Sequence, residues 1–150
     1  ALPAFTAFQH PGRPLGRLDY LLGLLFVLCL VGETVADQQQ WNFHQRKAAA
    51  VAGGASMEPG FLNTGLFRFS RHPNYFFEIS QWWLVYAFGA VAAGSLMQWT
   101  VLGAVLLTIL FVGSTRFTEE ISSAKYPQYA QYQRITSAVI PWFPRTDRSA

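Results

Sequence analysis

Three long stretches of this 150-residue chain contain almost no charge. They extend from about Leu18 to Val31, from Tyr75 to Ala93 and from Leu96 to Thr115. Because an α-helix rises about 1.5 Å per residue, each stretch approaches the roughly 20 residues that cross about 30 Å of hydrocarbon. We therefore expect an all-α fold: a polytopic membrane helical domain with about three transmembrane helices, followed by interfacial C-terminal helices.

The composition agrees with a membrane protein. With 51% hydrophobic and 13% charged residues, the chain is more apolar than an ordinary soluble domain, although a soluble helical bundle is the alternative. The single cysteine, Cys29, lies within the first apolar stretch, so the sequence contains no disulfide framework and no cysteine cluster for a metal. The net charge of +3 comes from dispersed basic residues, which argues against a nucleic-acid partner.

The ends of the apolar stretches predict where helices begin and continue. The first stretch changes to "GETVADQQQWNFHQRK" with no helix breaker after Gly32, so we expect that helix to continue. Its polar side chains three and four residues apart would share one face: Glu33, Asp37, Gln40, Trp41 and His44. The second stretch follows the proline of "RHPNY", and proline is well accepted in the first turn of a helix.

The short loops predict the orientation. The loop "AAGSLMQ" between the second and third stretches carries no charge, whereas basic residues flank that hairpin: Arg46, Lys47, Arg68, Arg71, Arg116 and Lys125. The positive-inside tendency places these basic segments in the cytoplasm, in a bacterial inner membrane or the endoplasmic reticulum. After Phe117 we expect an amphipathic helix, a break at Tyr-Pro and a second short helix along the cytoplasmic interface.

Ionisable groups gather around the second stretch. Glu78 lies within it, where a charge costs about 2.5 to 3.5 kcal/mol on insertion scales, so it is a candidate functional residue unless it reaches the interface. Four polar residues stand at the helix start, where free backbone N–H groups and the helix dipole attract phosphate: Arg68, Arg71, His72 and Asn74. The alternative is that the basic residues only set the membrane orientation, while Asn74 or Ser70 caps the N-terminus of the helix.

These groups and the polar stripe lie at one expected membrane level. Basic side chains suit phosphates, carboxylates and amides suit ribose and base, and the neighbouring aromatic side chains could form walls. The residues therefore predict a polar, nucleotide-sized site closed by helix ends, without identifying the nucleotide.

Three segments add a resemblance: "ETVADQQQWNF", "FRFSRHPNYFFE" followed by "QWW", and "TEEISSAKYPQYAQYQRITSAVIPWFP". In this order and approximate spacing they resemble the C-terminal membrane domain of the steroid 5α-reductase-like family, which is related to the sterol C14- and C7-reductases. The resemblance covers about residues 18 to 145. Because the chain begins with Ala1, we expect residues 1–150 to be one such domain that lacks the N-terminal helices of a longer protein.

The resemblance implies an NADPH-dependent reductase of an activated C=C bond in a lipid or steroid-like substrate. It implies that the C-terminal helices hold the cofactor from the cytoplasmic side, with Glu119 near the last motif. With the helix-start residues, the expected cofactor-binding set is Asp37, Gln40, His44, Arg68, Arg71, His72, Asn74, Tyr75, Glu78, Arg116, Glu120 and Tyr126. The proton donor, the substrate and the oligomeric state stay open, with Glu78, Tyr126 and Tyr132 as candidate acids.

Two other functions stay open. Membrane methyltransferases that resemble isoprenylcysteine carboxyl methyltransferase carry a similar "RHP" and tyrosine before a hairpin, and they use S-adenosylmethionine. Asn74 and the "ETVADQQQ" stripe favour the reductase, whereas the lack of a basic pair on that stripe favours the methyltransferase. A non-enzymatic scaffold would use the same polar stripes to bind a protein.

Overall fold

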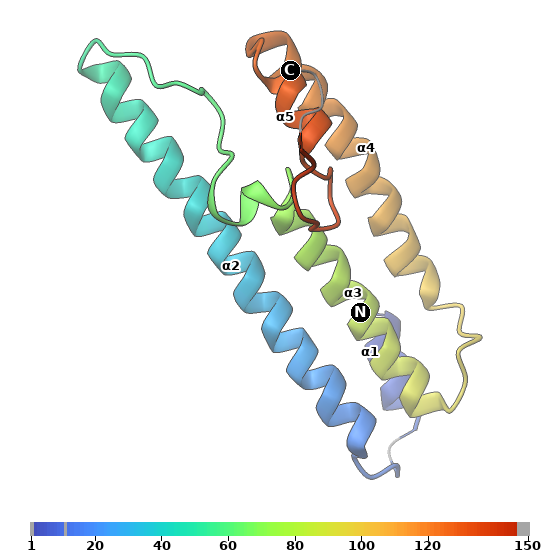
Figure 1. The fold of residues 1–150 in the computed structure, drawn as a ribbon. Coiled ribbons are helices and arrows are strands. Elements are labelled where there is room, and N and C mark those ends of the chain that lie inside the picture. The colour runs from blue at the N-terminus through green and yellow to red at the C-terminus, as the bar shows by residue number, and fades with distance from the viewer. Residues whose placement is uncertain (1, 11, 147–150) are drawn as a thin grey trace.

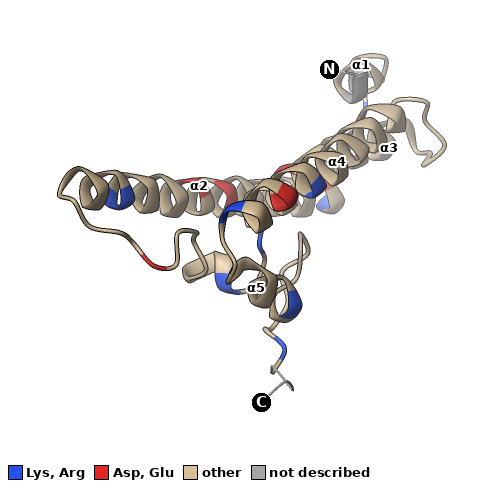
Figure 2. Cartoon of the chain, turned by 90° about the horizontal axis from the view of Figure 1, so that it is seen from above, with Lys and Arg blue, Asp and Glu red and all other residues tan. Residues whose placement is uncertain are grey.

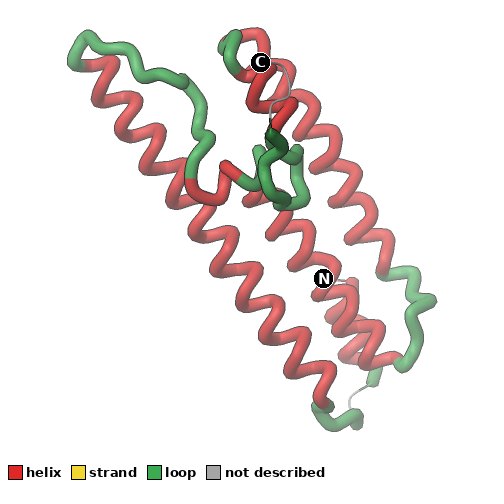
Figure 3. Tube along the Cα trace, in the orientation of Figure 1, coloured by secondary structure: helices red, strands yellow, loops and turns green. Residues whose placement is uncertain are grey.

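The computed structural model describes residues 2–10 and 12–146, and within them the chain is helical with no β-strand. In chain order the elements are α1 (Leu2–Phe8), α2 (Arg17–Ala52), the 3-10 helix η1 (Gly65–Arg68), α3 (Pro73–Ala93), α4 (Val101–Lys125) and α5 (Tyr129–Ile135) (Figures 1 and 3). The expected all-α fold is confirmed.

The three long helices form a layer. Helix α3 lies between α2 and α4 and packs against both, and α1 packs against α3 (Figure 1). Seen from above, α1 lies on one side of this layer, whereas α5 and the C-terminal segment that follows it, residues 137–145, leave it on the opposite side (Figure 2). One end of the layer is thus bounded by α5, the C-terminal segment and the long connection between α2 and η1.

Two of the three expected spans meet the requirements for crossing a membrane. Helices α2, with 36 residues, and α4, with 25, are each long and apolar enough, and the most apolar window of α2 contains no buried residue. Helix α3 has 21 residues but carries Glu78, Ser80 and Gln81, and a third span is not confirmed.

The sequence predicted some helix ends well and others poorly. Helix α2 continues past Gly32 to Ala52, as expected. Helix α3 begins with Pro73 at its first position, as expected. Its N-cap is His72, not the Ser70 or Asn74 considered above, and the Ser70 hydroxyl instead donates to the carbonyl of Val139 at 2.7 Å.

The third helix differs from its expected range. Helix α4 begins at Val101 instead of Leu96, because Gly94 caps the end of α3 in the left-handed conformation (φ +65°) and a turn follows. It then continues to Lys125, so "EEISSAK" forms its last turns and not a separate helix. The break at Tyr126 and the short α5 are confirmed, whereas α1 was not expected.

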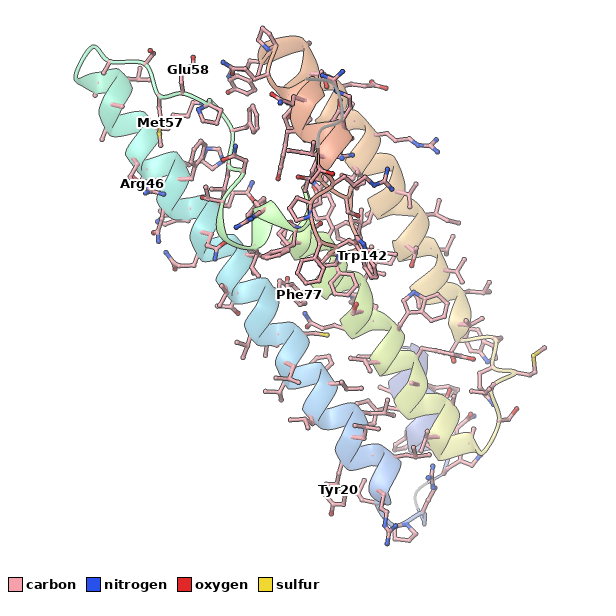
Figure 4. All side chains as sticks on the ribbon, viewed as in Figure 1. Tyr20, Arg46, Met57, Glu58, Phe77 and Trp142 are labelled. Atoms are coloured by element: carbon pink, nitrogen blue, oxygen red, sulfur yellow. The ribbon has the colours of Figure 1, made fainter. Side chains whose placement is uncertain are left out.

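Helices α2 and α3 approach closely at a glycine. A Cβ atom on Gly32 would lie 2.5 Å from the Phe77 ring, and Figure 4 shows Phe77 between the two helices. Real Cβ atoms do not come so close to a neighbour, so a side chain at this position must displace the ring. The absence of a side chain at Gly32 therefore sets the spacing of α2 and α3.

Replacing Gly32 with leucine is expected to lower the free energy of unfolding by about 1–3 kcal/mol, because overpacking pushes α2 from α3. Gly23→Leu is the matched control on the same helix, since no atom lies within 4 Å of a Cβ built there. Equilibrium unfolding in mixed detergent micelles measures both. Equal stability of the two variants would show that the Phe77 contact does not constrain the packing.

Candidate functional site

A cavity of about 350 Å³ lies where α2, α3 and α4 meet α5 and the connection before η1. Helix α2 contributes Gln40, His44 and Lys47, and the start of α3 contributes Asn74 and Tyr75. The remaining wall comes from the end of α4 with Tyr126, from α5, from residues 60–62, and from η1 and the residues between it and α3. Segments far apart in the sequence therefore build one polar and aromatic hollow.

Lys47 joins three of these segments. Its Nζ donates to the Tyr126 hydroxyl at 2.6 Å and to the Gly60 carbonyl oxygen at 2.5 Å. The same ammonium lies 4.7 Å from the centre of the Tyr126 ring. Among the described residues no carboxylate forms an ion pair with Lys47, so its positive charge is neutralised by no other group of the site.

The neighbouring lysines change the acidity of Tyr126. Burial alone raises the pKa of this phenol, but the hydrogen bond from Lys47 and the positive charges of Lys47 and Lys125 together outweigh burial, so the pKa of Tyr126 lies below its usual value. The Tyr126 hydroxyl is therefore more acidic than an ordinary tyrosine hydroxyl.

Aromatic rings form another part of the wall. Phe61 stacks on Tyr132 with 5.3 Å between ring centres and meets Tyr129 edge-on at 5.0 Å. Burial, with the charge of Glu119, raises the pKa of Tyr129 to about 12, and burial also raises that of Tyr132. The Tyr132 hydroxyl donates to the carbonyl of Phe67. Both phenols therefore stay neutral and support the wall.

Arg71 is held at the edge of the cavity by an internal ion pair. Its Nε and Nη2 donate to the two carboxylate oxygens of Glu119 at 2.6 and 3.0 Å, and its Nη1 donates to the carbonyls of Gln133 (2.8 Å) and Thr136. Gln133 also donates to Glu119, at 3.0 Å. Of the five N–H donors of an arginine, these contacts leave one for a ligand. Arg71 thus ties the start of α3 to α4 and α5.

His72 completes this corner. Its ring stacks on that of Tyr75 at 5.1 Å, and Nε2 lies 3.3 Å from Glu119 Oε1 without the alignment of a hydrogen bond. The buried Nε2 therefore has no hydrogen-bond partner in the described part of the chain. Because this atom is buried against the Glu119 carboxylate, His72 contributes to the cavity wall through the ring that stacks on Tyr75.

A profile of the family described as "Protein of unknown function (DUF1295)" matches residues 1–136. The chain belongs to the DUF1295 family. It is also similar to "Uncharacterized protein C594.04c" of Schizosaccharomyces pombe, with 40% identity over 147 residues. That match covers 91% of the DUF1295 chain and 42% of the relative, so the chain spans less than half of the relative's length. No solved structure matches it.

The cavity of the DUF1295 chain gathers more than half of the residues proposed from sequence. Those on its wall are Gln40, His44, Arg71, His72, Asn74, Tyr75 and Tyr126. Those outside it are Asp37, Arg68, Glu78, Arg116 and Glu120.

The residues outside the cavity have other surroundings. Glu78 lies within electrostatic range of the carboxylates of Glu33 and Asp37, and Glu33 accepts a hydrogen bond from Gln81 of α3. Asp37 is exposed, as are Arg68, Arg116 and Glu120. The expected polar stripe of α2 therefore divides: its C-terminal part lines the cavity and its N-terminal part faces α3.

Sequence reasoning assigned no binding role to several wall residues of the DUF1295 chain. Lys47 follows Gln40 by two helical turns, so the same stripe extended along α2 would have included it. Lys125 adjoins Tyr126 in the sequence, which is also a usable signal. Phe61 lies in an irregular connection, and Tyr129 gains its place only when α5 folds back, so no local pattern marks them.

Proposed function

We propose that this DUF1295 chain is the cofactor-binding part of an integral membrane, NADPH-dependent reductase that acts on an activated C=C bond of a lipid or steroid-like substrate. One observation carries the proposal: a polar cavity with cations, amides and aromatic rings lies beside the ends of helices apolar enough to span a membrane. The ordered motifs support it.

The residues of the cavity fit a dinucleotide. Lys47 and Lys125 supply positive charge for phosphate, and the amides of Gln40 and Asn74 suit ribose hydroxyls or a carboxamide. The ring of Phe61 and its tyrosine neighbours offer stacking surfaces. A volume of about 350 Å³ is at the small end for ligand sites. The cavity would therefore hold one part of the dinucleotide, with the rest extending through its open mouth.

The bound cofactor supplies hydride, and the protein supplies position and a proton. Of the three candidate acids, Glu78 lies outside the cavity and the Tyr132 hydroxyl is committed to Phe67. Tyr126 is on the wall, and its lowered pKa brings it closer to proton transfer near neutral pH. We therefore favour Tyr126 as the proton donor. The basic flanking segments support a site that faces the cytoplasm.

The second candidate function is an S-adenosylmethionine-dependent membrane methyltransferase. Two observations favour it: the cavity is small, and the guanidinium of Arg71 is largely engaged by Glu119 and by carbonyl oxygens. Both suit a cofactor smaller and less anionic than NADPH. The lysines and Asn74 on the wall still favour the reductase, and binding measurements separate the two.

Ligand-dependent thermal stability tests the proposal. The purified chain is titrated with NADPH, NADH and S-adenosylmethionine, and a ligand at 100 times its dissociation constant stabilises the fold by about 2.7 kcal/mol. We expect stabilisation by NADPH and an affinity about tenfold lower in Asn74→Ala, since one polar contact is worth about 1.4 kcal/mol. Asn42→Ala is the matched control, because Asn42 is exposed on α2 and bonds Gln38 at 2.8 Å outside the cavity.

The other outcomes are equally informative. A shift with S-adenosylmethionine alone would replace the reductase by the methyltransferase. No shift with any of the three would leave the scaffold function. Equal NADPH affinity of the Asn74 and Asn42 variants would show that the nucleotide binds elsewhere.

A further inference from the structure

The C-terminal segment, residues 137–145, is fixed in place by backbone hydrogen bonds yet exposes its largest apolar side chains. The bonds run from Arg71 N to Ser137 O (2.8 Å), from His72 N to Ala138 O (3.0 Å), from Trp142 N to Phe69 O (2.9 Å) and from Arg145 N to Ile135 O (2.8 Å). The side chains left uncovered are Ile140, Trp142 and Phe143, which are 67%, 70% and 76% exposed. Because these hydrogen bonds fix the backbone of the segment, the exposure of its apolar side chains belongs to the folded structure.

Two hollows lie on either side of this segment. A hollow of about 520 Å³ contains the arginines Arg134 and Arg145 beside Trp142. A second hollow, of about 650 Å³, is almost entirely apolar and is formed by α2, α3 and α4 together with the segment. Ile140 lines both, so the basic hollow adjoins the apolar groove across one side chain.

The charge of the basic hollow is not neutralised within the described part of the chain. Neither Arg134 nor Arg145 forms an ion pair with a carboxylate there, whereas Arg71 of the same hollow is paired with Glu119. Free guanidinium groups next to an exposed tryptophan match the headgroup level of a bilayer, where aromatic and basic side chains gather. The apolar groove runs along helices suited to the hydrocarbon.

We propose that this pair of hollows binds a bilayer phospholipid with an anionic headgroup. One acyl chain lies in the apolar groove, and the headgroup phosphate lies between Arg134 and Arg145, with Trp142 at the interface. The groove shares no lining residue with the polar cavity, since Tyr75 faces the cavity and Phe76 the groove. The basic hollow meets the polar cavity only at Arg71, whose guanidinium is largely engaged by Glu119 and by carbonyl oxygens. The lipid is therefore not the cofactor, and this proposal stands whether or not the nucleotide proposal holds.

Comparison of two phospholipids tests the proposal. The purified chain in neutral detergent is titrated with dioleoyl phosphatidylglycerol and with dioleoyl phosphatidylcholine, and thermal stability is followed. We expect at least tenfold tighter binding of phosphatidylglycerol. This preference should fall to parity in the double variant Arg134→Gln/Arg145→Gln and persist in Arg116→Gln, whose arginine is exposed on α4 and lines neither hollow.

Further arms separate the remaining explanations. Inorganic phosphate at the same concentration should not compete, because the acyl chain contributes to binding. The charge-preserving pair Arg134→Lys/Arg145→Lys should retain most of the preference, and the single variants Arg134→Gln and Arg145→Gln, which should each reduce it, replace the glutamine pair if that variant does not fold. Equal binding of the two lipids by the parent chain, or full competition by inorganic phosphate, would overturn the proposal.

Discussion

Replacing Arg71 with methionine is expected to lower the free energy of unfolding by about 3–5 kcal/mol. The side chains of Arg71 and Glu119 are only 9% and 13% exposed, and removal of one partner leaves the other carrying an unpaired charge. The variant also loses the bonds to the carbonyls of Gln133 and Thr136, which join α3 to α5 and the chain after it. Equilibrium unfolding in mixed micelles, followed by circular dichroism, measures the change.

Arg116→Met is the control for this substitution, because Arg116 is exposed on α4 and its loss should change stability by about 0.5 kcal/mol or less. The double variant Arg71→Met/Glu119→Met should recover part of the lost stability, since no unpaired charge remains. A single Arg71 variant as stable as the parent would contradict the role of the ion pair. Weak nucleotide binding by an Arg71 variant could come from lost stability or from a lost ligand contact. Substitution of Asn74 is therefore the better test of the cavity.

The helices could largely be predicted from the sequence because their signals are local. Long apolar stretches predict α2, α3 and α4, and Pro73 predicts the start of α3. The start of α4 was placed too early, because hydropathy does not register the left-handed turn at Gly94 and the short connection after it. The apolar residues Leu96 and Met97 lie in that connection, so apolar character alone does not make them helical.

The candidate site could be predicted only in part, because its contacts join distant parts of the chain. Asn74 and Tyr126 carry recognisable patterns, and both lie on the cavity wall. The bond between Lys47 and Tyr126 spans 79 residues, and that between Arg71 and Glu119 spans 48, so no spacing rule reveals either. A basic residue such as Arg71 at a helix start can bind phosphate only if its N–H donors are free. In this chain the Glu119 carboxylate, which comes from another helix, occupies two of the Arg71 donors.

Replacing Lys47 with methionine is expected to weaken NADPH binding by about 10- to 100-fold, which corresponds to about 1.4–2.8 kcal/mol. The substitution removes one of the two lysine charges of the cavity that no described carboxylate neutralises, while methionine keeps the apolar stem. It also releases the Gly60 carbonyl and the Tyr126 hydroxyl, which Lys47 joins across the cavity. Isothermal titration with NADPH measures the loss, and thermal stability without ligand shows whether the fold persists.

Arg46→Met is the matched control, because this substitution removes the same charge from the adjacent position. The Arg46 side chain is exposed and donates only to the Asn42 carbonyl of its own helix, at 3.3 Å. Figure 4 shows Arg46 on α2, away from α4 and α5. If the effect of Lys47 came from net charge alone, both variants would weaken binding equally. If it comes from a local contact, only Lys47→Met does so, and Lys47→Arg restores part of the affinity because it returns the cation without the geometry of a single ammonium. Full NADPH affinity in Lys47→Met would remove the nucleotide from this cavity, whatever the stability of the variant.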